Sequence, residues 1–381
     1  MIPQLINYLS KHIWFNILVY LVLVAFIIVL ASLLSNFCVL LKQKLHLSDG
    51  VIAGIIMSII TSLPELITCI AAVISNKKGS IGVGDIIGSN IFDITILSFF
   101  LLLFVYFFWK QKVNNVNITT LVFCFVDCII VFLGMLSDHY LPWLSWNGFN
   151  FWSLILFGSY ILWFYFVFKN QKIEKQDILQ DFVKHENKYF KKFNAFWLVL
   201  IIIGLSLVLS IVSVLICDAS VCLIFNHWKI NETFGGALLL GVSTSLPEVI
   251  CCIDLAYKKE YNMLISTMIG SCCFNFFILT FGNIAYMFIW NGENSMYEFN
   301  KYSIIQILAL ACIIALAYIY CRFNALKKHC KRNNVIGINA FLLLIIIFVF
   351  ISYLFLNLVY SSELFLFENN TFWTKLFGFL L

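Results

Sequence analysis

Charged residues are scarce in this sequence. Only 11% of its 381 residues are Asp, Glu, Lys or Arg, whereas 62% are hydrophobic and 40 are Phe. This number of charges is too small to form the surface of a water-soluble protein. The composition therefore predicts a chain embedded in lipid. Apolar runs long enough to cross a bilayer recur along the whole length. We predict ten spans, at 14–38, 48–74, 82–108, 116–136, 149–168, 195–217, 233–256, 263–290, 302–321 and 335–360. We interpret the first as a retained helix rather than a signal peptide.

Basic residues are missing from the interiors of these spans, because all 24 Lys and Arg residues fall in predicted loops or tails. With the N-terminus outside, 18 of them lie on the cytoplasmic side and 6 outside, which follows the positive-inside rule. We therefore expect a multi-pass protein of the cell (cytoplasmic) membrane. The net charge of +5 then indicates orientation, and no nucleic-acid partner is expected. Tyr140, Trp143 and Trp146 lie between spans four and five, where we expect them to anchor the chain at the membrane interface.

Histidine is also rare, with six residues at predicted span ends or in loops. No His or Cys cluster indicates zinc, and no nucleophile stands with a base, so we expect neither an enzyme nor a cofactor. The thirteen cysteines are an odd number, and most fall inside spans. We interpret them as small packing residues rather than as a disulfide framework.

Only four prolines occur, and two of them occupy matching places in apolar spans. Pro64 belongs to a TSLPE segment at 61–65, and Pro247 belongs to an identical segment at 244–248. The following span carries GSNIFD at 88–93 in the first half and GSCCFN at 270–275 in the second. The chain therefore contains one internal repeat.

Each half holds five predicted spans, an odd number, so the second copy must enter the membrane with opposite polarity. We predict an all-α polytopic membrane protein of about ten helices in two inverted five-helix repeats, the architecture of secondary transporters. Its parts are a first repeat at 1–168 with an ion-binding segment at 53–93, a cytoplasmic linker at 169–194 that we expect to be a solvated loop, a second repeat at 195–360 with an ion-binding segment at 235–275, and a tail at 361–381.

A proline inside a helix frees the carbonyl four residues earlier, here those of Ile60 and Ser243. Helical spacing then places hydroxyl groups on the same face as each glutamate, and a second polar stripe on the next span. The candidate oxygen set is Ser58, Thr61, Ser62, Glu65, Ser89, Asn90 and Asp93 in the first half, and Gly241, Thr244, Ser245, Glu248, Ser271 and Asn275 in the second. Carboxylate, hydroxyl and carbonyl oxygens suit Ca²⁺ and, in smaller numbers, Na⁺.

The buried carboxylates Glu65, Glu248 and Asp93 have no basic residue in the predicted spans to balance them. An ionised carboxylate at the centre of a span costs about 2.5–3.5 kcal/mol on insertion scales. The compensating charge must come from bound metal ions or protons. Asp127 and Asp254 have no counterpart in the other half, and we favour a structural role for both.

At these residues the sequence resembles the cation/calcium exchanger superfamily, the sodium/calcium exchangers in particular. The match is sharp at 53–93 and 235–275. The resemblance implies that Glu65 and Glu248 coordinate calcium, that the Ser and Thr residues of the set help to form sodium and calcium sites, and that carbonyls near Ser58 and Gly241 contribute. It also implies alternating access, in which the first and sixth helices slide across a rigid remainder while sodium entry drives calcium export.

The sequence departs from that family in three places. Ile60 and Ser243 stand where glycine commonly precedes TSLPE. Cys272 replaces an asparagine oxygen that Asn90 retains in the first half. Asp93 and Asn275 reverse the arrangement of acid and amide found in some prokaryotic members.

We expect a sodium-driven calcium antiporter whose partners are Ca²⁺, Na⁺ and the lipid bilayer. A proton-coupled or potassium-dependent exchanger on the same fold is the nearest alternative. A cation channel would also need midplane carboxylates, although inverted broken helices favour alternating access.

Overall fold

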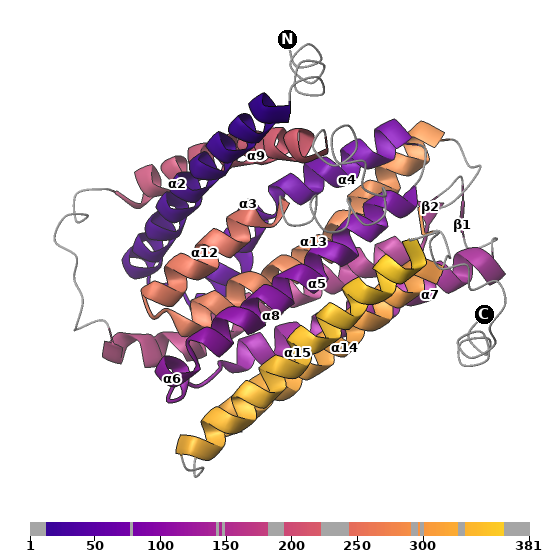
Figure 1. Cartoon of the computed structure of the whole chain (residues 1–381). Coiled ribbons are helices and arrows are strands. Elements are labelled where there is room, and N and C mark those ends of the chain that lie inside the picture. Colours follow the sequence, from indigo (N-terminus) through magenta and orange to yellow (C-terminus); the bar gives the residue numbers. More distant parts are fainter. Residues whose placement is uncertain are drawn as a thin grey trace.

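The computed structural model describes residues 13–76, 79–141, 145–146, 149–181, 194–221, 244–290, 296–297, 301–326 and 332–361. Figure 1 shows a bundle of long helices. Within the described residues, nine helices are long and apolar enough to cross a membrane. They coincide with nine of the ten predicted spans. The remaining span, 233–256, is described only from Thr244 onward.

The first half contains the helices α2 (Ile13–Leu45), η1 (Gly50–Met57, a π-helix), α3 (Ser58–Thr61), α4 (Leu63–Asn76), α5 (Gly79–Leu103), α6 (Val105–Phe108), α7 (Asn115–Tyr140) and α8 (Trp152–Asp181). A two-stranded antiparallel sheet, β1 (Ser145–Trp146) and β2 (Phe149–Asn150), joins α7 to α8. The second half contains α9 (Ala195–Val221), α12 (Leu246–Tyr257), α13 (Tyr261–Trp290), α14 (Lys301–Leu326) and α15 (Arg332–Ser361).

Two expectations from the sequence are wrong. The stretch 169–194 is not a loop at its start, because α8 continues as a helix to Asp181. Lys42 is not in a loop either, since it lies in the last turn of α2 and is buried. There it forms ion pairs with Asp49 and Glu260. These carboxylates explain how a lysine can be buried at the end of a span.

Helix α13 is the most deeply buried of the candidate spans and packs against α5, η1, α4 and α7. It passes very close to the first half at Gly270, opposite Gly54. A Cβ atom built on Gly270 would lie 2.1 Å from the carbonyl oxygen of Gly54. Only glycine at position 270 permits the two backbones to pass this closely, so Gly270 fixes where α13 crosses η1.

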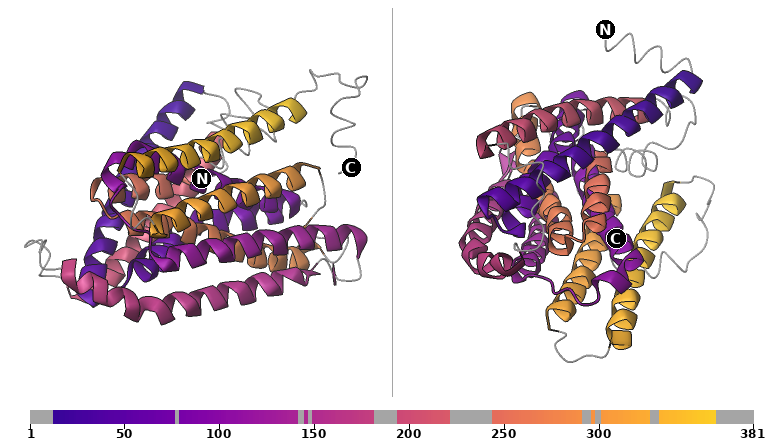
Figure 2. Two further views of the ribbon diagram at one scale, coloured as in Figure 1. Left: turned by 90° about the horizontal axis from the view of Figure 1, so that it is seen from below. Right: turned by 90° about the vertical axis from the view of Figure 1, so that its left-hand side faces the viewer.

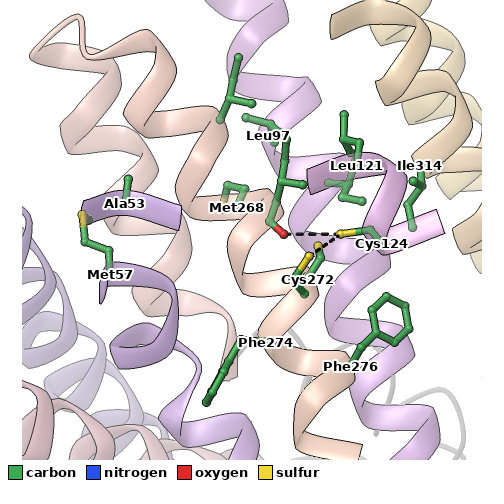
Figure 3. Close-up of a cluster of buried hydrophobic side chains, with 14 of the residues drawn as sticks. Ala53, Met57, Leu97, Leu121, Cys124, Met268, Cys272, Phe274, Phe276 and Ile314 are labelled. Carbon is green, nitrogen blue, oxygen red and sulfur yellow. Dashed lines mark hydrogen bonds between the residues drawn. The ribbon is translucent and has the colours of Figure 1, made fainter. Parts of the chain in front are cut away.

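Apolar side chains from several helices fill the interior around α13 (Figure 3). Met57 of η1, Leu121 of α7 and Ile314 of α14 are drawn there, and all are fully buried. The thiols of Cys124 and Cys273 form a hydrogen bond of 3.2 Å within this interior and no disulfide. Among the cysteines of the described part, none forms a disulfide and nearly all are buried, as expected of packing residues.

Two helix pairs flank this core on opposite sides, as the right-hand view of Figure 2 shows. Helices α14 and α15 pack against each other and on α5. On the other side, α2 and α9 pack against each other. The contacts of this second pair cross between the halves, because α2 also contacts α12, and α9 also contacts α4 and α3.

The expected interfacial aromatic residues lie at the α7–α8 connection. Tyr140, at the end of α7, is 68% exposed, and Trp146 forms part of β1. Trp143 lies outside the described residues. Their place at a membrane interface stays a prediction.

Candidate ion-binding site

Both TSLPE segments contain a serine with non-helical backbone angles directly before a helix begins. The backbone leaves helical geometry at Ser62, where φ is −93° and ψ is 12°, and at Ser245, where φ is −83° and ψ is 7°. A new helix begins directly afterwards, at Leu63 in one half and at Leu246 in the other. Pro64 and Pro247 therefore occupy the first turn of a helix, where a missing N–H donor costs nothing. The predicted break is confirmed in the first half, where Ser62 separates α3 from α4. In the second half, Ser243 and the preceding residues lie outside the described part.

Each break places a glutamate in the first turn of the helix that follows it, Glu65 in α4 and Glu248 in α12. The amide groups of a helix N-terminus carry partial positive charge, which stabilises a carboxylate there. Both glutamates are nonetheless removed from solvent, with exposures of 1% and 0%. In Figure 1, α3 and α12 lie side by side near the middle of the molecule, so the two breaks meet.

The second polar stripe of each half runs along α5 and α13, which pack against each other. Every candidate residue in the described part is buried, namely Ser58, Thr61, Ser62, Glu65, Ser89, Asn90 and Asp93 of the first half and Thr244, Ser245, Glu248, Ser271 and Asn275 of the second. Gly241 lies outside the described residues. The sequence thus selected a set of polar residues that the fold brings into its interior.

The contacts among these residues run between the halves. The Ser62 hydroxyl donates to Glu248 Oε1 at 3.1 Å and also forms a hydrogen bond with the Ser271 hydroxyl. Asn275 Nδ2 donates to Asn90 Oδ1 at 2.9 Å. Side chains from both repeats therefore form one continuous polar cluster.

Asp93 of the first half also lies next to side chains of the second half. The hydroxyls of Ser245 and Ser271, both from the second half, lie beside its carboxylate. They do not satisfy hydrogen-bonding geometry, so both Asp93 oxygens remain without a partner. The first half thus supplies a carboxylate that faces hydroxyl groups of the second half.

Three carboxylates share this cluster. Glu65 interacts electrostatically with Glu248 and with Asp93, and Glu248 interacts with Asp93. In the described part of the chain, no Lys, Arg or His forms an ion pair with any of them. Lys42, the buried lysine, is paired with Asp49 and Glu260 instead. The negative charge of the cluster is therefore uncompensated by the described side chains.

Several buried oxygens of the cluster have no hydrogen-bond partner: Glu65 Oε2, Ser89 Oγ, both Asp93 oxygens, Ser245 Oγ, Glu248 Oε2 and Asn275 Oδ1. A buried polar group without a partner costs about 1–3 kcal/mol, and more when it is charged. A bound cation would explain why so many unpartnered oxygens lie together, because they would be its ligands. Hard cations such as Ca²⁺ and Na⁺ prefer oxygen ligands of this mixed kind.

The carboxylates alone do not form a ready metal site. Over the described residues, no three His, Cys, Asp or Glu side chains are arranged to hold one ion. A cation would therefore need hydroxyl, amide or carbonyl oxygens as well. The hydroxyls of Ser58 and Thr61 donate to carbonyls of their own helix, at Gly54 and Met57, which leaves their oxygen lone pairs available.

The two unmatched acids lie apart from this cluster. Asp254 forms an ion pair with Lys258, the residue that directly follows α12. Asp127 of α7 is buried beside Ser159 and the Cys124–Cys273 contact, with Oδ1 unpartnered. Neither carboxylate takes part in the electrostatic interactions of Glu65, Glu248 or Asp93. A structural role fits Asp254, as the sequence suggested.

Sequence reasoning missed one acid near the cluster. Asp85 of α5 interacts electrostatically with Glu65 and accepts a hydrogen bond of 3.1 Å from the Thr68 hydroxyl. The signal was present, because Asp85 precedes Ser89 by four residues and Asp93 by eight. That spacing places all three on one helix face.

Comparison with known proteins agrees with this architecture. A family model described as "Sodium/calcium exchanger protein" matches residues 15–169 and 196–359, which are the two halves. The Escherichia coli (strain K12) protein "Inner membrane protein YrbG" is 23% identical over 230 residues, which is 60% of this chain and 67% of the relative.

Solved structures of the sodium-calcium exchanger NCX_Mj share the fold. One, soaked with 2.5 mM Na⁺ and 10 mM Sr²⁺, superposes with a TM-score of 0.59 at 20% identity, covering 88% of this chain and 96% of the other. Another, soaked with 100 mM Na⁺ and 10 mM Sr²⁺, gives a TM-score of 0.59 at 18% identity, with coverages of 91% and 98%. Because the family model spans both repeats and most of the chain, this protein belongs to the sodium/calcium exchanger family of membrane transporters.

Proposed function

We propose that this chain exchanges sodium for calcium across the cell membrane, with its N-terminus outside, and that the cluster described above is its ion site. The observation that carries the proposal is the set of three buried carboxylates with unpartnered oxygens where the two halves meet. Family membership and the Na⁺ and Sr²⁺ soaks of NCX_Mj support the choice of ions.

In this proposal, Glu65 and Glu248 bind Ca²⁺ from opposite repeats, and Asp93 adds the third negative charge. The hydroxyls of Ser62, Ser245 and Ser271 complete the oxygen shell, together with the other members of the candidate set. Either a calcium ion or sodium ions can neutralise the carboxylates. Because both use the same oxygens, they compete. This competition couples the two fluxes when the site changes sides only with an ion bound.

The packing of α2 and α9 supports alternating access. Each of these helices contacts the break-containing segment of the other half, α2 on α12 and α9 on α3 and α4. Both carry many exposed apolar side chains, such as Phe26 and Leu207. One surface of the α2–α9 pair faces lipid and the other packs on the segments that carry the site. Such a pair can slide past the core with little loss of buried contact. We propose that its movement exposes the site to one side of the membrane at a time.

Calcium uptake into proteoliposomes tests this function. Vesicles loaded with Na⁺ and diluted into Na⁺-free medium with labelled Ca²⁺ are expected to accumulate calcium, whereas vesicles without a Na⁺ gradient are not. Uptake that follows an imposed pH or K⁺ gradient and ignores Na⁺ would contradict sodium coupling and favour the alternative exchangers. The Asp254→Asn variant is a control, because its ion pair lies outside the cluster.

A further inference from the structure

The strongest feature outside the proposed ion site is the pair formed by Asp85 and Thr68. The Thr68 hydroxyl lies 3.1 Å from Asp85 Oδ2 and 3.1 Å from the carbonyl oxygen of Glu65. It therefore connects the Asp85 carboxylate of α5 with the turn of α4 that holds a site glutamate. Asp85 also interacts electrostatically with Glu65.

Asp85 lies between the site and one end of the bundle. It is near the start of α5 at Gly79, while Thr68 lies in α4 on the way from Glu65 to the helix end at Asn76. Eight residues of helix separate Asp85 from Asp93, about 12 Å at 1.5 Å per residue. Asp85 is partly exposed, whereas Asp93 is only 1% exposed.

An unpartnered hydroxyl lies between these two acids. Ser89 is one turn from each of them on the same face of α5, is fully buried, and has no hydrogen-bond partner for its Oγ. Asp85, Ser89 and Asp93 thus form a line of oxygen ligands that leads from partial exposure into the site. Among the described residues, no lysine or arginine forms an ion pair with Asp85.

The second half has no acid at the matching positions. The residue equivalent to Asp85 is Thr267, whose hydroxyl donates to Met263 O in its own helix. The residue equivalent to Thr68 is Cys251, whose thiol contacts Ala31 O of α2. The inverted repeat places these neutral residues toward the opposite face, so the acidic line belongs to one side of the membrane.

We infer that Asp85 and Thr68 form an accessory binding site for hydrated divalent cations on the α4–α5 side, which delivers Ca²⁺ to Glu65. This inference rests on the proposed function and adds a sidedness to it. A carboxylate at the edge of a low-dielectric interior attracts cations and speeds their arrival. One carboxylate and one hydroxyl offer few ligands, so they bind the ion weakly and release it to Glu65.

The test compares calcium affinity on the two sides in oriented vesicles, using exchange of labelled for unlabelled Ca²⁺. This self-exchange needs no sodium, so it reports on Asp85 even if sodium coupling proves wrong, while absent Na⁺-driven uptake in the wild type would contradict the coupling alone. Asp85→Asn keeps the acceptor for Thr68 and removes the charge. We expect it to raise the KM for calcium by about tenfold on the α4–α5 side and to leave the other side unchanged.

Asp85→Glu, which retains the charge, is expected to keep the wild-type KM, and Asp254→Asn is a matched control for loss of a carboxylate toward the opposite face. The wild-type KM on the α4–α5 side is also expected to rise with ionic strength more than that of Asp85→Asn, because salt screens the attraction. An unchanged KM, an equal rise on both sides, or a fall in maximal rate alone would overturn the inference. If Asp85→Asn does not fold, Thr68→Val is measured instead. A rise in its KM on the α4–α5 side alone supports the accessory site, and an unchanged KM overturns it.

Discussion

The two repeats share a backbone plan but differ in charge. Both have a non-helical serine, Ser62 or Ser245, directly before a helix, and both present a glutamate from the first turn of that helix. The stripe that follows carries Asp93 in the first half and the neutral Asn275 in the second. Duplication has therefore preserved the geometry that exposes oxygens, while the number of negative charges on each side of the site has diverged. A site assembled in this way is symmetric in shape and asymmetric in electrostatics.

The largest expected effect comes from removing either of the two glutamates that occupy matching positions in the repeats. Glu248→Gln and Glu65→Gln each remove a buried charge that a bound cation would pair, which costs about 2–5 kcal/mol, or at least about 30-fold in calcium affinity. Without calcium, each variant is expected to be more heat-stable than the wild type, because the remaining carboxylates repel less. Thermal unfolding with and without Ca²⁺ checks both points.

The control is again Asp254→Asn, which should keep the stabilisation by calcium. If Glu65→Gln and Glu248→Gln unfold at the wild-type temperature and are stabilised equally by calcium, these glutamates do not bind it.

The glycine crossing gives the next largest effect. Gly270→Ala would place a methyl group 2.1 Å from Gly54 O, which no side-chain adjustment can relieve. We expect a loss of about 1–3 kcal/mol or more in the free energy of unfolding, together with loss of transport, because η1 and α13 must separate. Gly88 is the equivalent residue of the first half, and no atom of the described residues lies within 4 Å of a Cβ built there.

Gly88→Ala is therefore the matched control, and it should be stable and active. Denaturant unfolding of both variants tests the contrast. Equal stability of the two alanine variants would show that the close crossing is not required.

The charge difference between the stripes can be tested by exchanging it. Asp93→Asn is expected to weaken calcium binding by about tenfold or more, because one of three negative charges is lost. The double variant Asp93→Asn/Asn275→Asp restores the total charge, and Asn275 already contacts Asn90 of the first half. We expect it to regain most of the binding.

Calcium titration of the single and double variants measures the recovery. A double variant as weak as Asp93→Asn would show that the position of the charge matters more than its number. Asn275→Asp alone provides the fourth corner of the cycle.

The smallest effect concerns the ion pairs at one corner of the molecule. Lys42 joins α2 to Glu260 before α13 and to Asp49 before η1, and its side chain is 10% exposed. Lys42→Met would remove the basic partner of two acids and should cost about 1 kcal/mol of stability, less than in a fully buried pair because Glu260 is 32% exposed. Lys258→Met removes the more exposed pair with Asp254 and should cost less than about 1 kcal/mol.

Denaturant unfolding of these two lysine variants measures the difference. A larger loss in Lys258→Met than in Lys42→Met would reverse this ranking and show that burial does not govern it.

The sequence was sufficient for the parts of the structure that local signals determine. Hydropathy located the spans, and proline at Pro64 and Pro247 located the helix breaks, because both act through the backbone nearby. It could not show that Ser62 contacts Glu248 and Ser271, since those contacts depend on how two distant segments pack. The same reason hid the crossing at Gly54, where the partner lies in the other half.

The surroundings of two residues, Lys42 and Asp85, could not be predicted from their positions along the chain. Lys42 looked like a loop residue, yet α2 continues past it and two acids surround it. Asp85 was passed over because it lies outside the repeated motif, although its spacing from Asp93 places it on the site-facing side of α5.

Equilibrium binding of labelled calcium to the purified protein tests most directly whether the two repeats form one shared site. The measurement compares saturable capacity in the wild type, Glu65→Gln and Glu248→Gln over the same calcium range. A shared site predicts that either substitution alone removes the saturable binding found in the wild type. Half of the wild-type capacity remaining in each variant, at unchanged affinity, would show that each repeat binds calcium by itself and would contradict the shared site.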